Sequence, residues 1–427
     1  MNKFFVLIVC VLQCLYCNAG QITIEQCEAL ARENYPLIKK YGLIDRMRSI
    51  ELSDVNKGWL PRIGVYAQAT VQNIVPGFPE SMQPMLHELG VDLPGLRKDQ
   101  YRVGVDVSQT IWDGGKSKAD RDVARSESAA QSAANDVEMY TVRQRVQDLY
   151  FAVLLTDAQI EQVALMADLL KANLDKLRSM YDCGTVMQSD VDAVEAQFLA
   201  TCQNAKRLDG MRRGYCRALE LFVGQSLDGM DFVCPQEILP AELACRRPEL
   251  DLFDAQKKAN NARRSLIEVA TMPHIGFFAQ GYYGYPGYDY FASMGSRSWT
   301  VNLMAGVKVS WTLDALYNKG NNKSRLLLKD ELTDNDIEVF RRNNAILSAQ
   351  QQEDIRSRRS LMEDDERIVA LRTSVRKAAE ARLDNGVIDT TDLLDKITEE
   401  STAAVNAAYH HIEYVRSIYQ LKYTLNQ

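Results

Sequence analysis

The chain has 427 residues, of which 50 are basic and 57 are acidic, so its formal net charge is −7. Hydrophobic residues make up 46% and charged residues 25% of the sequence, which is ordinary for a folded protein. This composition excludes a collagen-like protein, a disordered protein and a basic nucleic-acid-binding protein.

The N-terminus has the pattern of a secretory signal. Lys3 supplies a positive charge, residues 4–16 are mostly apolar, and residues 17–19 place small side chains where a signal peptidase cleaves. The apolar run is too short to span a bilayer, and no other uncharged apolar run reaches ~18 residues, so we expect no transmembrane helix. The alternative for residues 1–19 is a buried N-terminal helix. Lipidation of Cys17 is left open, because Tyr16 precedes it where a lipoprotein signal has a small residue.

Six cysteines follow the signal, and none of them has the C-x-x-C spacing of a zinc or redox motif. Six in such a long chain are too few for a disulfide scaffold. We expect most of them to be small buried apolar side chains, and a disulfide between Cys234 and Cys245 is the alternative. The six are Cys27, Cys183, Cys202, Cys216, Cys234 and Cys245.

The sequence after the signal contains an internal duplication. Residues 61–68 and 273–280 are identical at five of eight positions. The interval from Gly104 to Gly184 is 80 residues, and so is the interval from Gly306 to Gly386. We therefore divide the chain into a signal at 1–19, a first repeat at 20–224, a linker at 225–239 and a second repeat at 240–427.

The first repeat begins with a predicted helix over residues 23–57. Residues 62–72 and 101–112 then alternate apolar and polar side chains, which is the period of a β-strand. Residues 73–99 between them contain four prolines and are predicted to form a loop.

A long helix is predicted over residues 116–182, which contain neither proline nor glycine. Gly184 permits a tight turn, and a second helix returns over residues 188–223. Apolar residues recur along the long helix at spacings of four and three, which is typical of a coiled-coil seam. The seam consists of Val142, Val146, Leu149, Val153, Ile160, Val163, Ala167, Leu170, Leu174, Leu177 and Tyr181, with Thr156 as its one polar member.

The second repeat has the same order of elements. Its first strand is aromatic within residues 277–285, and its second strand alternates over residues 300–313. The long helix is predicted at about residues 322–384, with a weaker seam that suggests one face in contact with water. That seam consists of Leu361, Ile368, Leu371, Val375 and Ala378.

The alternating strands allow two interpretations. One is a half-buried sheet in a soluble domain, and the other is a membrane barrel with apolar side chains toward lipid and polar side chains toward a wet lumen. The strands are long enough to cross a bilayer, and Tyr and Trp near their ends fit an interfacial girdle. Four strands cannot close a barrel, and an open sheet edge is excluded from lipid. A membrane location therefore requires several chains to share one barrel.

Five segments carry a resemblance to a known family, the TolC-like outer membrane efflux proteins of Gram-negative bacteria. They correspond to the opening helix, the start of the first strand, the junction from strand to helix, and the two helix tips. In this sequence they are Ile22–Pro36, Trp59–Ile63, Val107–Gly115, Tyr181–Thr185 and Leu383–Val387. The junction contains Asp113, Gly114 and Gly115, and we interpret the Gly114–Gly115 dipeptide as a bend rather than a phosphate-binding loop.

The resemblance implies a mainly α fold with β structure. Two tandem helix–strand–strand–helix–helix repeats would supply long antiparallel coiled-coil helices to an α-barrel and four strands to a trimeric 12-stranded membrane β-barrel. The implied function is passive export of small molecules or polypeptides in a tripartite efflux or type I secretion system. The implied partners are two further copies of the chain, a periplasmic adaptor, an inner-membrane pump and the lipid of the outer membrane, with no cofactor and no nucleic acid.

The resemblance also assigns a periplasmic gate. Asp392 and Asp395 match the family's acidic rings, and they lie three residues apart on one helical face. Three copies would place six carboxylates around the axis, which favours cations and raises some carboxylate pKa values by repulsion. The alternative is that these are ordinary acids at a helix N-terminus, with Asp389 as the cap.

The two tips are the implied adaptor contacts, and ordinary turn chemistry is the alternative explanation of their glycines. Asp190 matches an acid that pairs in some members with a basic residue on the second tip. Ile388 occupies that second position, so the pair cannot form here in the same way. The implied contact residues are Cys183, Gly184, Thr185, Asn385, Gly386 and Val387.

The sequence contains no G-x-S-x-G, P-loop or H-E-x-x-H motif, and we expect the protein not to be an enzyme. His410 and His411 are adjacent, so on a helix they would point apart, and we expect an exposed pair and no metal site. The alternative function is a secreted coiled-coil structural or adhesion protein with a small soluble sheet.

Overall fold

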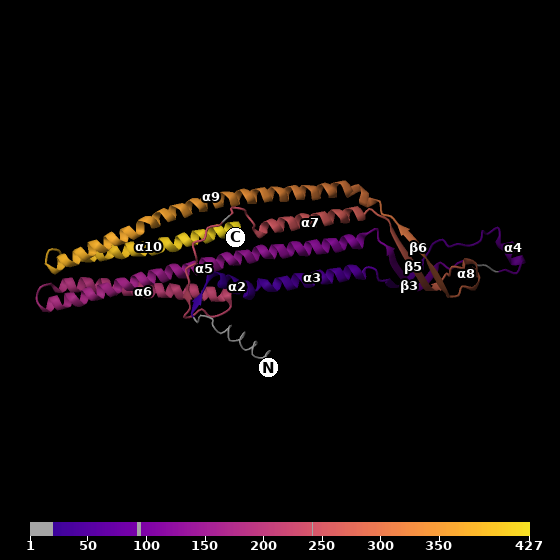
Figure 1. The fold of residues 1–427 in the computed structure, drawn as a ribbon. Helices are drawn as coiled ribbons and strands as arrows, with labels where there is room; N and C mark the ends of the chain where they lie inside the picture. Colours follow the sequence, from indigo (N-terminus) through magenta and orange to yellow (C-terminus); the bar gives the residue numbers. More distant parts are fainter. Residues whose placement is uncertain (1–19, 92–94, 241) are drawn as a thin grey trace, which may run out of the picture. The chain divides into compact units, whose positions relative to one another are not determined.

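The computed structural model describes residues 20–91, 95–240 and 242–427, so the predicted signal at 1–19, including Cys17, lies outside the described residues. The order of helix, strand, strand, helix and helix occurs twice, which confirms the predicted mainly helical fold (Figure 1). The elements are β1 (Gln21–Ile22), α2 (Ile24–Asn34), α3 (Leu37–Lys57), β2 (Arg62–Val71), α4 (Gln83–Glu88), β3 (Asp99–Trp112), α5 (Lys116–Asp182), α6 (Gln188–Val223), β4 (Asp231–Phe232), α7 (Pro248–Val269), β5 (His274–Tyr285), α8 (Tyr290–Ser296), β6 (Thr300–Ser310), α9 (Asp314–Asp384) and α10 (Thr390–Leu425).

Proline explains two differences from the predicted elements. The single helix expected over 23–57 is broken into α2 and α3 at Pro36, which cannot donate a backbone hydrogen bond and which holds Tyr35 in an extended conformation. The loop expected over 73–99 contains the short helix α4, which has Pro84 in its first turn, where the missing N–H costs nothing.

Three further features differ from the predicted elements: the start of one helix, the end of one strand, and an additional short strand. Helix α9 begins at Asp314 rather than near 322, and it continues through Gly320. The alternation expected to 313 ends with β6 at Ser310. The predicted linker contains β4, which pairs in parallel with β1 through Gln21–Asp231 and Ile22–Phe232.

The chain forms two compact units, and each contains segments of both repeats. Residues 43–131 and 254–334 form the unit that holds the large sheet. The remaining described residues form a helical unit.

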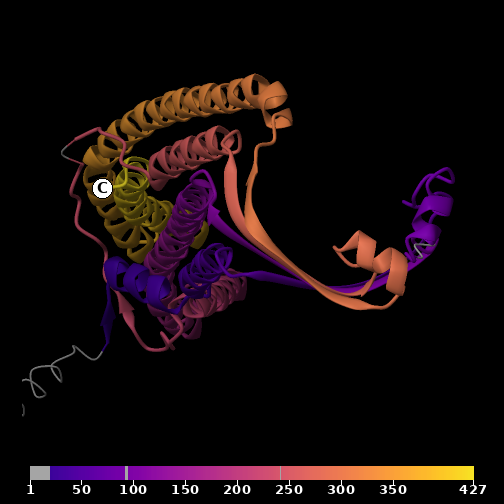
Figure 2. The same ribbon diagram turned by 90° about the vertical axis from the view of Figure 1, so that its right-hand side faces the viewer.

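The sheet consists of four antiparallel strands in the order β2-β3-β5-β6, so β2 and β6 are its edges, and it is strongly curved (Figure 2). Val65 pairs with Val105, Val105 with Gly281 and Gly281 with Leu303. Because side chains alternate between faces, the odd-numbered residues of all four strands share one face. A β-bulge after Thr110 shifts the register so that Trp112 pairs with Ile275 and joins this face, which explains why the alternation fails there.

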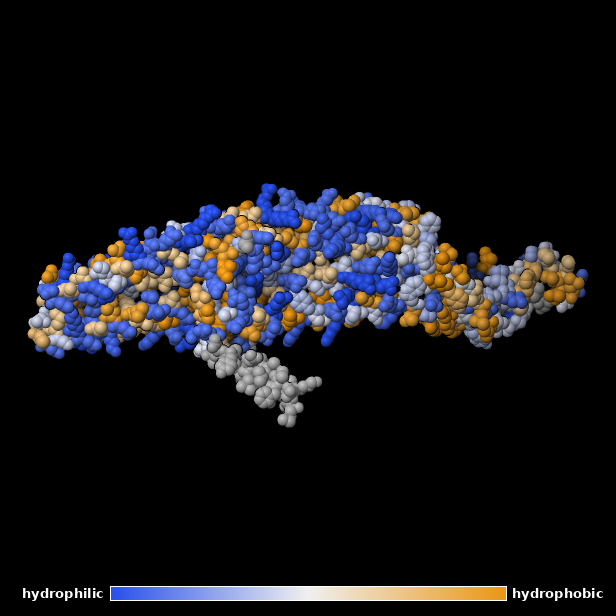
Figure 3. Space-filling view, viewed as in Figure 1, coloured by the Kyte–Doolittle hydropathy of each residue, from blue (hydrophilic) through white to orange (hydrophobic). Residues whose placement is uncertain are grey.

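The two faces of the sheet differ in chemistry. The odd-numbered face is apolar and uncovered: Val65 is 77% exposed, Leu303 79% and Val307 64%. Figure 3 shows hydrophobic residues gathered over the strands. The opposite face carries mainly polar, charged and glycine residues, with Phe278 and Met304 as apolar exceptions. A sheet of a soluble domain buries its apolar face, so this arrangement favours the barrel interpretation.

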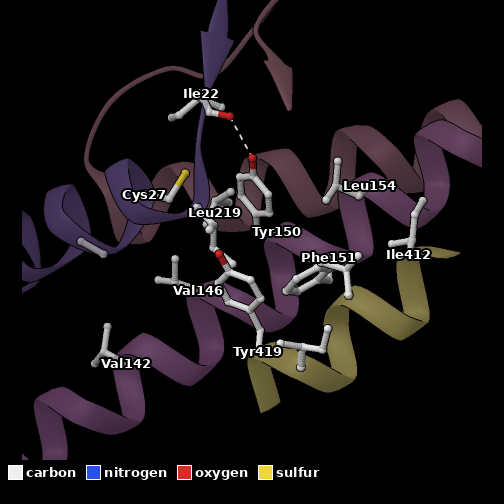
Figure 4. Packing of buried hydrophobic residues seen from close by; sticks show 14 of the residues in the cluster. Ile22, Cys27, Val142, Val146, Tyr150, Phe151, Leu154, Leu219, Ile412 and Tyr419 are labelled. Carbon is white, nitrogen blue, oxygen red and sulfur yellow. Dashed lines mark hydrogen bonds between the residues drawn. The ribbon is translucent and has the colours of Figure 1, made fainter. Parts of the chain in front are cut away.

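The core of the helical unit forms where α2, α5, α6 and α10 pack together (Figure 4). Val146, Tyr150 and Phe151 of α5 are fully buried there. The Tyr150 hydroxyl lies 2.8 Å from the carbonyl oxygen of Ile22 and 2.7 Å from that of Val233, so it fixes the β1–β4 pair against α5. One 18-residue stretch of α5 is apolar enough to cross a membrane by length and composition, and several residues of the same helix pack into this core.

A second core lies near the helix tips and confirms the predicted seam of α5. It joins α5 to α6, α9 and α10. Tyr181 alone among the predicted seam residues is exposed. The buried residues of this core are Leu170, Leu174, Leu177, Val191, Val194, Ala379, Leu383, Leu393 and Ile397.

The predicted seam of α9 is wrong. Its members Leu361, Ile368, Leu371 and Val375 are 45–58% exposed. The packed face instead contains Ile355 and Met362, which contact the first core, and Ala379 and Leu383, which belong to the tip core. Charged residues occupy the remaining packed positions and are paired. They are Arg358 with Glu413, Asp365 with His410 and Arg376 with Glu400.

The cysteines are only partly as expected. Cys27 and Cys216 are buried, whereas Cys183 and Cys234 are exposed. All six cysteines of the described residues are free, so the alternative of a bond between Cys234 and Cys245 is not realised.

Candidate functional site

The two helix tips end in the same backbone turn. Gly184 has φ of 75° and Gly386 has φ of 69°, the left-handed conformation that glycine adopts without strain. The N–H of Thr185 donates to the carbonyl of Met180 at 3.0 Å, and the N–H of Val387 donates to that of Arg382 at 2.9 Å. These are the bonds of a Schellman motif. Turn geometry therefore accounts for both tip glycines.

Asp392 and Asp395 lie in the first turns of α10. The side chain of Asp389 accepts a hydrogen bond from the Asp392 N–H at 2.8 Å, so Asp389 caps the helix as expected. Leu393 is buried in the tip core, and both aspartates are exposed away from it. Neither carboxylate has an ion-pair partner among the described residues, so their negative charges are uncompensated.

Asp190 has a local role at the first tip. Its carboxylate accepts from the Met187 N–H at 2.9 Å and so caps α6. Ile388, which stands where some family members have the basic partner, is half-buried against the tip core. A different ion pair joins the two helical hairpins near the tips, between Lys176 of α5 and Asp384 of α9. This pair could not be predicted from the sequence, because 208 residues separate its members.

The exposed surface of the tips includes two apolar side chains, the predicted contact Val387 and also Met187, which the family motifs did not include. Met187 is 73% exposed and Val387 is 68% exposed. Cys183, Thr185 and Asn385 are also exposed. An apolar residue inside a predicted turn is the sequence signal that could have identified Met187. Exposed apolar side chains at both turns are typical of a surface that binds another protein.

Asp113, Gly114 and Gly115 redirect the chain from β3 into α5. The Asp113 carboxylate accepts from the N–H of Gly115 at 3.0 Å, from the N–H of Ser117 at 2.6 Å and from the Ser117 hydroxyl. Burial raises the pKa of Asp113, but these hydrogen bonds outweigh burial and hold the pKa below its ordinary value. A Cβ on Gly114 would lie 2.6 Å from the Met272 side chain, so the bend requires glycine there. This is a structural turn.

The adjacent histidines face different partners. His410 Nδ1 lies 2.8 Å from Asp365, and His411 Nε2 lies 3.1 Å from Glu237. Both are therefore paired with carboxylates, which the sequence analysis did not anticipate. Within the described ranges, no group of three or more His, Cys, Asp or Glu side chains is placed to hold a metal ion.

Comparisons with known proteins agree with this architecture. Residues 52–225 match the family described as outer membrane efflux protein. No curated protein sequence matches the chain.

Solved structures share the fold along nearly the whole chain. The outer-membrane channel OprN is 17% identical with a TM-score of 0.65, over 94% of this chain and 89% of OprN. CusC is 15% identical with a TM-score of 0.68, over 96% of this chain and 95% of CusC. The CmeC outer membrane channel of Campylobacter jejuni is 14% identical with a TM-score of 0.64, over 94% of this chain and 85% of CmeC.

Proposed function

Because residues 52–225 match the outer membrane efflux protein family, we propose that the chain forms the outer-membrane exit channel of a tripartite efflux or type I secretion system. One observation carries this proposal: all four strands turn apolar side chains to one exposed face and polar side chains to the other. Lipid is the environment that stabilises such a face, and an aqueous lumen suits the opposite one.

The sheet supports a shared barrel. Its edge strands β2 and β6 have no further strand partner among the described residues. Unpaired backbone groups are excluded from lipid, so β6 of one copy would pair with β2 of the next. Three copies would give the 12 strands of the proposed homotrimeric barrel. The exposed apolar residues Leu361, Ile368 and Leu371 of α9 would then face a neighbouring copy.

The tips support two further roles. The uncompensated carboxylates of Asp392 and Asp395 would form the periplasmic gate, where three copies concentrate six negative charges. The exposed turns with Met187 and Val387 would bind the periplasmic adaptor, which connects the channel to the inner-membrane pump. The pump would supply the energy, and small molecules or polypeptides would pass through passively.

Planar-bilayer recordings test the channel and its gate together. We expect Asp392→Ala with Asp395→Ala to increase single-channel conductance and to reduce cation preference, because the repulsive ring is removed. Glu363→Ala with Asp364→Ala is the matched control, since these are two exposed acids of α9 away from the tip. Conductance and ion preference that stay unchanged in the tip variant would remove the gate assignment.

A further inference from the structure

The polar face of the sheet has a charge imbalance. Its even-numbered strand positions carry three cations, Arg62, Arg102 and Lys308, and one anion, Asp106. His274 also lies on this face and is left out of the charge sum. Each chain therefore contributes a net charge of two positive units, and three copies contribute six.

These charges are not neutralised within the sheet. None of the four ionised side chains forms an ion pair within the described parts of the chain. Arg62 and Lys308 are exposed, and together with Ser108 and Thr110 they line a hollow of about 110 Å³ on this face. The Arg102 guanidinium lies 5.0 Å from the ring centroid of Tyr282 and keeps its full charge. Along β3, Asp106 lies four residues from Arg102, which corresponds to about 13 Å, too far for direct compensation.

We propose that the barrel segment of the channel is selective for anions. This inference rests on the proposed function, because it requires the polar face to line a lumen. Under this proposal, the barrel, which is the outer part of the pathway, prefers anions, whereas the acidic gate prefers cations. Anionic solutes would be concentrated in the barrel, and strongly cationic ones would be repelled from it.

The dimensions allow these charges to act across the whole lumen. Twelve strands spaced ~4.8 Å apart and tilted by roughly 40° enclose a barrel with a backbone radius of about 12 Å. Side chains narrow the open radius further. The Debye length is ~10 Å at 0.1 M salt and ~3 Å at 1 M salt. The selectivity should therefore be present in dilute salt and be lost in concentrated salt.

The test measures reversal potentials in a KCl gradient across planar bilayers. The reference is a gate-neutral channel, Asp392→Asn with Asp395→Asn, in which the tip acids no longer favour cations. We expect this channel to pass chloride better than potassium at ~0.1 M salt and to lose the preference at ~1 M salt.

Substitutions on the polar face identify the source of the preference. In the gate-neutral channel, we expect Arg62→Gln with Lys308→Gln to lower the chloride-to-potassium permeability ratio, and adding Arg102→Gln to bring it to one or below. The double variant is informative by itself, since neither side chain makes a hydrogen bond or an ion pair within the part of the chain that the structure describes. Asp106→Asn is the matched control of opposite sign and should raise the ratio.

The outcomes separate this inference from the function on which it rests. A gate-neutral channel that conducts but has no anion preference in dilute salt would overturn the inference and leave the channel function intact. A ratio that does not respond to removal of the three cations would do the same. Failure of the wild-type protein to form any conducting pore would overturn the proposed function and the inference with it.

Discussion

Gly184 and Gly386 hold equivalent places at the ends of two long helices, and in both cases the backbone requires glycine. A Cβ at either position would meet no atom within 4 Å, so the requirement comes from the positive φ and not from crowding. Gly114 differs, because both its φ of 66° and the Met272 side chain oppose a Cβ. The sequence identified all three as turn residues, but only the structure separates these two causes.

Gly386→Ala should destabilise the second tip by about 1–2 kcal/mol, the cost of a left-handed conformation for an L-residue. Gly214→Ala is the matched control. Gly214 lies inside α6 with a helical φ and open space around it, so alanine there should stabilise by up to about 1 kcal/mol. Hydrogen exchange at the ends of α9 and α10 reports the difference. Equal protection of these amides from exchange in the two variants would show that the left-handed conformation of Gly386 does not require glycine.

Asp113→Ala should lower the free energy of unfolding by about 1 kcal/mol at neutral pH, because three hydrogen bonds at the start of α5 lose their acceptor. The folded pKa of Asp113 lies below its unfolded value, so its contribution is present at neutral pH and is lost as the pH falls through the folded pKa. Denaturant titrations of both proteins at several pH values check this. A difference between them that grows toward acid would be inconsistent with the lowered pKa.

At the scale of elements, uninterrupted helices were the most predictable part of the fold. Helices α5 and α6 begin and end where the sequence predicted, because Gly184 is the only strong break between them. The seam of α9 could not be found from apolar spacing. Ion pairs such as Arg376–Glu400 occupy part of its packed face, while Ile368 and Leu371 lie on an uncovered one.

Short elements were missed for a different reason. Two residues in β1 and two in β4 are too few to show alternation, and their position depends on contacts with distant residues. Tyr150 is 128 residues from Ile22 and 83 residues from Val233 along the chain. The proposed gate and tip residues were identified only through family motifs, and the Lys176–Asp384 pair is seen only in the structure.

Tyr150→Phe should cost about 1–2 kcal/mol. It keeps the buried ring but leaves the carbonyls of Ile22 and Val233 without their shared hydroxyl donor. Tyr409→Phe is the control, since Tyr409 is 40% exposed and its hydroxyl has no hydrogen-bond partner among the described residues. Thermal unfolding of both variants measures the contrast. Equal melting temperatures would show that the hydroxyl does not hold the β1–β4 pair.

At the scale of the whole molecule, the two faces of the sheet predict which side chains contact lipid and which contact water. A charged side chain introduced on the apolar face should destabilise the barrel by about 2–4 kcal/mol near the bilayer centre, because it would be placed in lipid. A charged side chain on the opposite face would contact water and should be tolerated. Leu303 and Met304 are neighbours on β6 that lie on opposite faces, so they form a matched pair.

We expect Leu303→Arg to reduce the amount of protein recovered in the outer membrane and Met304→Arg to leave it nearly unchanged. Quantitative blotting of membrane fractions after equal expression compares the two. Greater loss from Met304→Arg than from Leu303→Arg would invert the assignment of the faces.

The most direct test of the account is the mass of the protein extracted from outer membranes in mild detergent, measured by native mass spectrometry. The account requires three chains in one particle, because four strands cannot close a barrel in lipid. A particle with the mass of three processed chains is the expected result. A stable single chain, recovered without detergent from the soluble fraction, would contradict it.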